Sequence, residues 1–397
     1  MQIRICRGNE HCECIEKVDR KICGDDVMAK LIDITGKALS GEWGTDDENG
    51  NGIPVLRTTN FTNEGLVNYN DVVTRTITKK NIDDKFLRKG DIIIEKSGGS
   101  DKFPVGRVIY FDGDEKTYLF NNFTGLLRVK NQNIWYPRYV FYSLYANYKR
   151  GGTRVYENKT TGLHNLKTDD YVSRYEVAEV DKTDQISICE RLDKVFEIIK
   201  LREQELQLLD NLIKARFVEM FGDPRSNPYG FNMKMLKDTC KVITGNTPSR
   251  SVEEYYGDYV EWIKTDNIVS GLLNPTKASE MLSEEGMKVG RAVGKDSILM
   301  ACIAGSIASI GRVCVTDRTV AFNQQINAVV PEDYNILFLY VLLQLSKEYL
   351  AEEVNMALKG ILSKSKLEEK EFMVPPIELQ NQFADFVHQV DKSKLLR

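Results

Sequence analysis

Residues 185–221 read QISICERLDKVFEIIKLREQELQLLDNLIKARFVEMF, and this stretch decides the fold of the chain. Its apolar side chains recur every three or four residues while charged residues occupy the other positions, which is the pattern of a helix with one apolar seam. At ~1.5 Å per residue the helix would be roughly 54 Å long. The seam consists of Leu192, Val195, Ile199, Leu206, Leu209, Ile213 and Phe217.

A seam of this length needs a second helix to cover it. The candidate is the last stretch of the chain, which follows Pro375-Pro376 and in which Gln382-Phe383 resembles the opening Gln185-Ile186 of the first helix. We predict an antiparallel helical pair, in which the second helix is only roughly 30 Å long. Its apolar stripe consists of Phe383, Phe386 and Val390.

The composition is that of a globular protein with several domains. The chain has 397 residues, of which 42% are hydrophobic and 28% charged, with a formal net charge of −4. Length alone suggests two or three domains. No long apolar run is present and the N-terminus has no apolar signal block, so we expect a cytoplasmic location. The acidic balance argues against nucleic-acid binding by overall charge, although local basic faces are compatible with it.

The cysteines fit a reducing compartment, and we expect them to be thiols. Four lie within apolar patterns and are predicted core residues: Cys189, Cys240, Cys302 and Cys314. Four others crowd the N-terminus beside His11 and could in principle hold zinc: Cys6, Cys12, Cys14 and Cys23. Ligand pairs of structural zinc sites are separated by two to four residues, whereas one residue separates Cys12 from Cys14, so we predict no metal.

The chain contains one unit twice. Residues 53–60, IPVLRTTN, and residues 260–267, VEWIKTDN, both read as a strand that runs into a polar loop. Later, VGRV at 105–108 is answered by IGRV at 310–313. Matches in the same order at nearly constant spacing indicate an internal repeat. We predict an α+β fold with mixed α/β domains in residues 1–184 and 223–374, a spacer helix in 185–222 and a short final helix in 375–397.

Two similar units on a helical spacer suit a target with two half-sites, and DNA is such a target. Polar residues stand where the strands of both units end, and amide, hydroxyl and cationic groups can pair with base edges and phosphates. The alternative is a scaffold with two protein-binding modules. The candidate DNA-binding residues are Arg57, Thr58, Thr59, Asn60, Lys96, Ser97, Asn121, Asn122, Thr160, Thr161, His164, Asn165, Lys264, Thr265, Asp266, Asn267, Asn323 and Gln324.

The chain resembles the specificity subunits of type I restriction-modification enzymes over essentially its whole length. In the first half the resemblance rests on GEWG (41–44), LRTTNFTNEG (56–65), GDIIIEKSGGS (90–100), PVGRVIYF (104–111) and TTGLHNL (160–166). In the second half it rests on TGNTPS (244–249) and on residues 262–268 and 311–325, together with the two helices.

The resemblance implies a non-catalytic subunit with two target-recognition domains, each of which reads one half of a split DNA site. Two modification subunits, which would carry S-adenosylmethionine and methylate adenine, would dock on the helices, so the seam residues above are also the predicted partner-binding residues. Restriction subunits would add translocation and cleavage with ATP and Mg²⁺. The family's second helix is about as long as the first, whereas here it is short; either the chain is truncated or a partner completes the surface.

Residues with catalytic potential do not combine into a known motif. Asn227-Pro228-Tyr229-Gly230 lacks the second proline of the Asn-Pro-Pro-Tyr clamp of amino-methyltransferases, and no glycine-rich cofactor loop follows a strand. Glu95 and Lys96 are adjacent in a predicted strand, so they face opposite sides and cannot share one metal ion with Asp91. We predict no catalytic residue, no metal and no cofactor in this chain.

Overall fold

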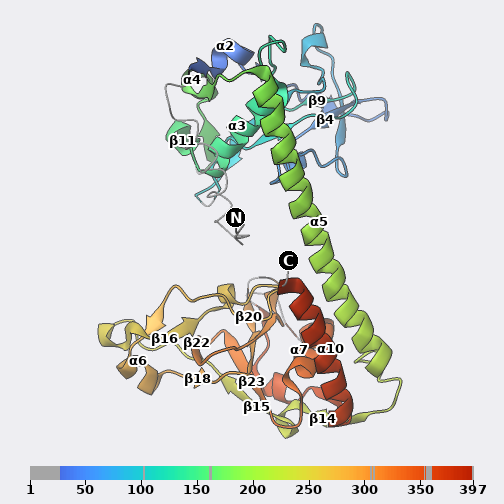
Figure 1. Ribbon diagram of the computed structural model, residues 1–397, viewed down its shortest axis with the longest axis vertical. Helices are drawn as coiled ribbons and strands as arrows, with labels where there is room; N and C mark the ends of the chain where they lie inside the picture. Colours follow the sequence, from blue (N-terminus) through green and yellow to red (C-terminus); the bar gives the residue numbers. More distant parts are fainter. Residues whose placement is uncertain are drawn as a thin grey trace. The chain divides into compact units, whose positions relative to one another are not determined.

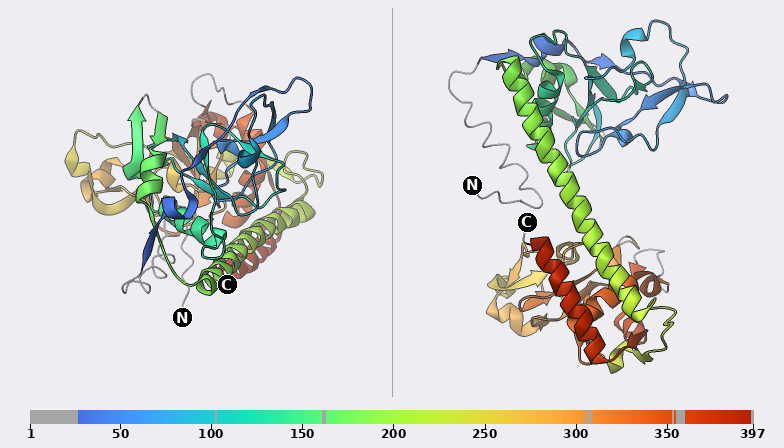
Figure 2. Two further views of the ribbon diagram at one scale, coloured as in Figure 1. Left: turned by 90° about the horizontal axis from the view of Figure 1, so that it is seen from above. Right: turned by 45° about the vertical axis from the view of Figure 1, so that its right-hand side comes forward.

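The computed structural model describes residues 27–101, 103–160, 163–304, 306, 309–352, 354 and 360–395 (Figures 1 and 2). The chain forms two compact units, Met1–Ile198 and Ile199–Arg397. One continuous helix, α5 (Lys182–Phe221), begins in the first unit and ends in the second. The predicted spacer helix is therefore present, and each unit includes part of it, residues 182–198 in the first and 199–221 in the second.

The first unit is built from short strands with α3 packed on its central sheet. The strand orders are β2-β10-β6-β8, β3-β5-β4-β9 and β11-β12-β7, and β1 pairs with β13. Strand β6 reads IIIE and is buried throughout, as a central strand requires. The elements are β1 (Met28–Lys30), α2 (Leu31–Thr35), β2 (Leu39–Ser40), β3 (Thr45–Asp46), β4 (Ile53–Leu56), η2 (Thr58–Asn60), β5 (Val73–Thr76), η3 (Asp83–Lys85), β6 (Ile92–Glu95), β7 (Ser97–Gly99), β8 (Val108–Tyr110), β9 (Leu119–Phe120), β10 (Thr124–Leu127), α3 (Pro137–Lys149), η4 (Arg154–Tyr156), β11 (Glu157–Thr160), β12 (Leu163–Leu166), α4 (Thr168–Arg174) and β13 (Glu176–Ala178).

The second unit has the same plan with α7 on its central sheet. Its strand orders are β15-β23-β19-β21 and β17-β16-β22-β18, with the pairs β14-β25 and β20-β24. The elements are β14 (Asn232–Met235), η5 (Leu236–Asp238), β15 (Cys240–Thr244), η6 (Glu253–Tyr255), β16 (Tyr256–Ile263), η7 (Thr265–Asn267), β17 (Met281–Leu282), α6 (Glu284–Val289), β18 (Ala292–Val293), β19 (Ile298–Ala301), β20 (Ile303–Ala304), β21 (Val313–Val315), β22 (Val320–Phe322), β23 (Ile326–Pro331), α7 (Ile336–Leu345), α8 (Lys347–Ala351), β24 (Gly360–Ile361), α9 (Lys364–Glu368), β25 (Glu371–Val374) and α10 (Ile377–Leu395).

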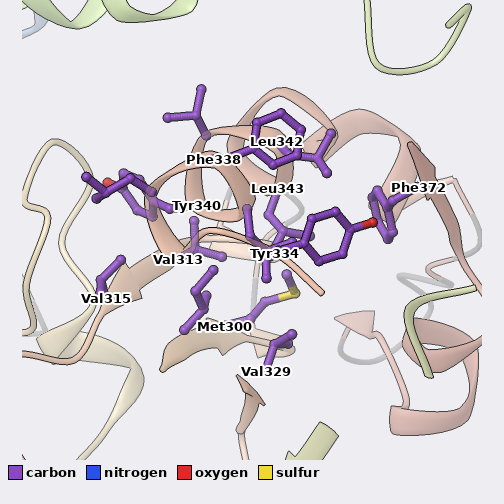
Figure 3. Close-up of a cluster of buried hydrophobic side chains, with 14 of the residues drawn as sticks. Met300, Val313, Val315, Val329, Tyr334, Phe338, Tyr340, Leu342, Leu343 and Phe372 are labelled. Carbon is purple, nitrogen blue, oxygen red and sulfur yellow. The ribbon is translucent and has the colours of Figure 1, made fainter. Parts of the chain in front are cut away.

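The main core of the second unit lies between α7 and the central sheet (Figure 3). Helix α7 reads ILFLYVLLQL, and a helix that is apolar on nearly every side is buried. Asn335 starts it, because its Oδ1 accepts a backbone N–H of the first turn at 3.0 Å. Met300 of β19 and Val329 of β23 lie beneath the helix in Figure 3, and both are fully buried.

Equivalent strands show the repeat in three dimensions. Strands β4 and β9 run parallel with Leu56 opposite Phe120, and β16 and β22 run parallel with Ile263 opposite Phe322. The central sheets have the same order and antiparallel sense, β10-β6-β8 in one unit and β23-β19-β21 in the other. The predicted internal repeat and the mixed α/β class of both units are confirmed.

The final helix, α10, lies along the C-terminal half of α5 (Figure 2). The Phe217 ring meets the Phe383 ring edge-on, with 5.4 Å between centroids. Lys394 Nζ lies 2.7 Å from Asp210 Oδ1. The start of α10, at Phe383, thus lies beside Phe217, and the end of α10, at Lys394, lies beside the earlier residue Asp210. The two helices are therefore antiparallel. The predicted second helix does cover this half of the seam.

Most of the seam is used inside the chain. Ile213, Phe217, Phe383 and Val390 belong to the core of the second unit, which corrects the prediction that they bind a partner subunit. Leu209 and Phe386 pack against that core, and Leu192 packs in the first unit. Ile199 and Leu206 are half-buried. Val195 is 51% exposed, so it remains a predicted partner-binding residue.

A buried glutamine fixes the start of the helix in each unit. Gln185 Oε1 accepts the Tyr136 N–H at 2.8 Å, and Gln380 Oε1 accepts the Asn335 N–H at 2.9 Å. Both glutamines are fully buried. The bonds tie α5 to the start of α3 and α10 to the start of α7. Gln185 therefore corresponds to Gln380, and the sequence-based match with Gln382 was wrong by two residues.

Candidate nucleic-acid interface

A short turn, η2, follows strand β4, and an asparagine side chain shapes it. Asn60 Oδ1 accepts the Arg57 N–H at 2.9 Å, while its Nδ2 donates to the carbonyls of Asn68 and Asp71, each at 3.0 Å. The side chain is buried, with Asn60 only 1% exposed. Both polar atoms of the amide are used inside the turn, so Asn60 positions the turn and does not present its amide to a base.

The second unit repeats this turn as η7 after strand β16. Asn267 Oδ1 accepts the Lys264 N–H at 2.9 Å. Its Nδ2 donates to the Thr276 hydroxyl at 3.2 Å and to the Lys277 carbonyl at 3.1 Å. The same self-contained amide therefore holds both turns, and a substitution of either asparagine would act through the backbone.

An arginine ties each turn to the central sheet. Arg107 Nη2 donates to the Thr58 carbonyl at 2.8 Å and Nη1 to the Phe61 carbonyl at 2.9 Å. In the second unit Arg312 Nη2 donates to the Thr265 carbonyl at 3.3 Å. These are the arginines of the VGRV and IGRV matches, so the sequence repeat marks a structural clamp.

The cations that open the two turns are paired with carboxylates. Arg57 Nη2 lies 2.9 Å from Asp71 Oδ2, and Lys264 Nζ lies 2.5 Å from Glu280 Oε1 and 5.1 Å from the centre of the Trp262 ring. The hydrogen bond from Lys264 holds the pKa of Glu280 below its ordinary value. Both cations are half-buried, and their exposed parts are cationic groups of the kind that contact phosphates.

A second turn joins β9 to β10 and β22 to β23, next to the first. Asn121 N donates to the Leu56 carbonyl at 2.9 Å, and Asn323 N donates to the Ile263 carbonyl at 3.0 Å. These two asparagines are buried, so they too position backbone. The exposed predicted residues at the tips of the four turns are Thr59, Asn122, Asp266 and Gln324.

Lys96 and Ser97 adjoin the second turn of the first unit. Lys96 N donates to the Phe123 carbonyl at 2.8 Å, and its Nζ donates to Ser40 Oγ at 3.1 Å. Partial burial lowers the pKa of Lys96 below its ordinary value. Ser97 in β7 lies opposite Asn165 in β12. The fold thus brings together predicted residues from four separate segments.

Several predicted DNA-binding residues lie on or beside the hairpin of β11 and β12, and they differ in exposure. His164 is buried, with Nδ1 3.1 Å from Glu157 Oε2 and Nε2 3.6 Å from Asp101 Oδ1. The Glu157 carboxylate is within hydrogen-bond distance of the buried imidazole, which is therefore not presented to a base. Thr160 ends strand β11, whereas Thr161 lies outside the described residues.

A basic cleft of about 590 Å³ lies beside β2 and was not predicted. Its lining includes Lys37, Lys89 and Lys130, and none of these three ammonium groups forms an ion pair with a described residue. Arg128 also lines it but is neutralised by Asp91, with Nη2 to Oδ2 at 2.6 Å. The sequence did not predict this cleft, because its three lysines are far apart along the chain and come together only in the folded structure.

The described part of the chain has neither a cluster of metal ligands nor a reactive thiol among its four buried cysteines. No group of three or more His, Cys, Asp or Glu side chains there could hold a metal ion. Burial raises the pKa of the Cys189, Cys240, Cys302 and Cys314 thiols to about 12, so they stay protonated. The N-terminal cysteines lie outside the described residues. Among the described helices, none has the length and apolar character to cross a bilayer.

Known proteins resemble the chain in sequence and in fold. The family model of the type I restriction modification DNA specificity domain matches residues 25–211 and 228–396. The type I restriction enzyme HindI specificity subunit of Haemophilus influenzae is 23% identical over 334 residues, covering 66% of this chain and 70% of that protein. The S subunit of a type I restriction-modification system from M. genitalium has a TM-score of 0.54 at 15% identity, covering 93% of this chain and 90% of that one.

A further solved chain comes from work on complex assembly and conformational transition of the type I R-M system. Its TM-score is 0.51 at 15% identity, and the match covers 94% of this chain and 92% of that one. The two segments matched by the family model coincide with the two structural repeats, and each contains one clamped turn pair. The chain therefore belongs to the type I restriction-modification DNA specificity family, whose members recognise DNA sequence and are not themselves catalytic.

Proposed function

We propose that the two units read the two halves of one split DNA sequence and direct adenine methylation and cleavage by other subunits. The repeated turn pair carries this proposal, because one backbone frame presents different side chains in the two units. Thr59 and Asn122 are exposed in the first unit, and Asp266 and Gln324 in the second. Hydroxyl, amide and carboxylate groups pair with different base edges. The same backbone turns with different exposed side chains therefore suit two different half-sites.

The catalytic chemistry is assigned to partner subunits in the cytoplasm. Two modification subunits would supply S-adenosylmethionine and the methyl transfer, and restriction subunits would supply ATP- and Mg²⁺-dependent translocation and cleavage. Membership of the specificity family supports this division of labour. It also accounts for a net charge of −4, because partners can contribute much of the phosphate contact.

The proposal is tested by co-expression of the chain with a type I modification subunit encoded beside it, followed by genome-wide mapping of methylated adenines with long-read sequencing. The expected result is one split motif with a fixed gap. A variant that replaces Asp266 and Gln324 with alanine should change the second half of the motif and leave the first half intact. A stable complex that methylates a continuous motif, or that methylates at random, would contradict the two-reader proposal.

The basic cleft gives a prediction about salt. Changing Lys37, Lys89 and Lys130 to glutamine should reduce the slope of log affinity against log salt by about 1 for each phosphate that the variant no longer neutralises. The measurement is fluorescence anisotropy of duplex DNA with the assembled methyltransferase between about 50 and 200 mM salt. The matched lysine-to-arginine triple variant should keep the slope. An unchanged slope in the glutamine variant would remove the cleft from the DNA interface, and a salt-independent wild type would favour the protein-binding scaffold.

Helix α5 also carries an exposed apolar stripe, which gives a prediction about partner docking. The side chains of Leu201, Leu208 and Leu212 are 56%, 67% and 48% exposed and lie away from the buried seam. Exposed apolar patches of this kind mark protein interfaces. Leu208→Glu should weaken binding to the modification subunit about tenfold or more in co-purification and titration, without a change in thermal unfolding. Val155→Glu, at a side chain 80% exposed in the first unit, should keep full binding.

A further inference from the structure

An exposed aromatic side chain stands on the second turn of the first unit. Phe123 follows Asn122 between β9 and β10, and its side chain is 53% exposed. A single exposed apolar residue needs no special explanation. What distinguishes Phe123 is its position among the predicted DNA-contacting groups, next to Asn122 and hydrogen-bonded through its backbone to Lys96.

The backbone around Phe123 is fixed on both sides. Its carbonyl accepts the Lys96 N–H at 2.8 Å, which joins the turn to the end of β6. The Asn121 carbonyl accepts both the N–H of Thr124 at 3.1 Å and its hydroxyl at 2.8 Å, which closes the turn. The phenyl group is therefore presented to solvent from a well-anchored turn. Because the backbone of the turn is already fixed, little backbone entropy is lost when the phenyl group binds.

The second unit has the same backbone with different chemistry. The Gln325 carbonyl accepts the Cys302 N–H at 2.8 Å, and the Asn323 carbonyl accepts the Ile326 N–H at 3.1 Å. Gln325 thus corresponds to Phe123, and Cys302 to Lys96. Gln325 turns its amide toward Asn323, because its Oε1 accepts Asn323 Nδ2 at 3.2 Å, and Cys302 is buried. Only the first unit places a phenyl group and an ammonium group at this turn.

We propose that Phe123 makes an apolar contact with the 5-methyl group of a thymine in the half-site read by the first unit. The proposal rests on the proposed function of the chain in reading split DNA sites. The thymine methyl is the one apolar group on the major-groove edges of the four base pairs, and phenylalanine is among the side chains that contact it. Asn122 and Lys96 would hold the neighbouring base edge or phosphate, which fixes the register of the phenyl group. The corresponding turn of the second unit makes no such methyl contact.

The test uses the assembled methyltransferase and duplexes that carry the motif found by methylation mapping. Each thymine of the motif, on either strand, is replaced in turn by deoxyuridine, which lacks only the methyl group. At one position of the first half-site the replacement should weaken binding by the wild-type complex about fourfold, the value of one buried methyl group. The Phe123→Gln complex should bind the thymine and deoxyuridine duplexes equally at that position.

The control is Ile134→Gln, at another exposed apolar side chain of the first unit, 49% exposed, which should keep the fourfold difference. The inference is overturned if no thymine of the first half-site shows the difference, if Phe123→Gln retains it, or if 2-aminopurine fluorescence shows the phenyl group inserted between bases. In those cases the wild-type complex still binds and methylates its split motif. If it does neither, the proposed function itself has failed.

Discussion

Replacing Phe217 with alanine is expected to lower the free energy of unfolding of the second unit by ~3–5 kcal/mol. The Phe217 ring is fully buried, and its centroid lies 5.0 Å from that of Phe221, 5.3 Å from that of Phe338 and 5.4 Å from that of Phe383. Truncation removes apolar burial and leaves a cavity where α5, α7 and α10 meet. The helices cannot move together to close the cavity without breaking the hydrogen bond of the buried Gln380, which ties α10 to α7.

The measurement is urea unfolding monitored by hydrogen–deuterium exchange of peptides from each unit. The unfolding free energy of the second unit is then obtained separately from that of the first. The control is Val218→Ala at the next position of the same helix, where the side chain is 45% exposed. That change should shift the unfolding free energy by no more than about 0.5 kcal/mol. Equal protection of the second unit in the two variants would show that the aromatic cluster contributes little.

Replacing Arg107 with methionine should cost ~3–5 kcal/mol near pH 8, because the change leaves a buried carboxylate without its cation. Arg107 Nη2 lies 3.4 Å from Glu95 Oε1, and the Glu95 side chain is only 6% exposed. The substitution also removes the donors that hold Thr58 and Phe61. The variant should therefore lose both stability and the first half of the recognised motif.

The cost of Arg107→Met should depend on pH. Burial raises the pKa of Glu95 above its ordinary value, and Arg107 opposes that rise. Without Arg107 the folded-state pKa rises further, so the folded chain binds the proton more tightly than the unfolded chain and stability falls as pH increases from about 4.5 through the folded value. The difference from wild type in urea unfolding should be largest near pH 8 and shrink toward about pH 5.

The matched control is the double variant Glu95→Gln with Arg107→Met, in which no buried carboxylate remains. Its stability relative to wild type should vary much less over the same pH range. A single variant that is destabilised equally near pH 8 and about pH 5 would mean that the unsatisfied carbonyls of the turn, and not the buried charge, dominate the cost.

The elements with strong local periodicity could be predicted from the sequence. The spacer helix was expected in residues 185–222 and extends over Lys182–Phe221, and the final helix was expected in residues 375–397 and extends over Ile377–Leu395. The repeat could be recognised from the match between VGRV and IGRV. The two motifs match because Arg107 and Arg312 have the same structural role, holding the turn of their unit. The match between the starts of the two helices was wrong by two residues, because Gln380 is recognised as the counterpart of Gln185 only from its burial and its hydrogen bond to Asn335.

The roles of individual polar residues could not be predicted in the same way. Asn60 and His164 were expected to meet DNA, but Asn60 bonds to the Asn68 and Asp71 carbonyls, and His164 lies between Glu157 and Asp101. The same polar group can pair with a base or with the chain's own backbone, and the sequence does not say which partner is nearer. Phe123 was not among the residues predicted from the sequence, and its exposure at the turn is seen only in the fold.

The sequence by itself determined the two units, the helix that begins in one and ends in the other, and the family to which they belong. These features follow from repeats and from periods of three to four residues, which are local properties of a chain. Only the tertiary structure decided which side chains are buried in those units, which are exposed at the turns, and that three distant lysines share one cleft. Burial and proximity depend on contacts between residues far apart in sequence, so they exist only once the sheets and helices have packed.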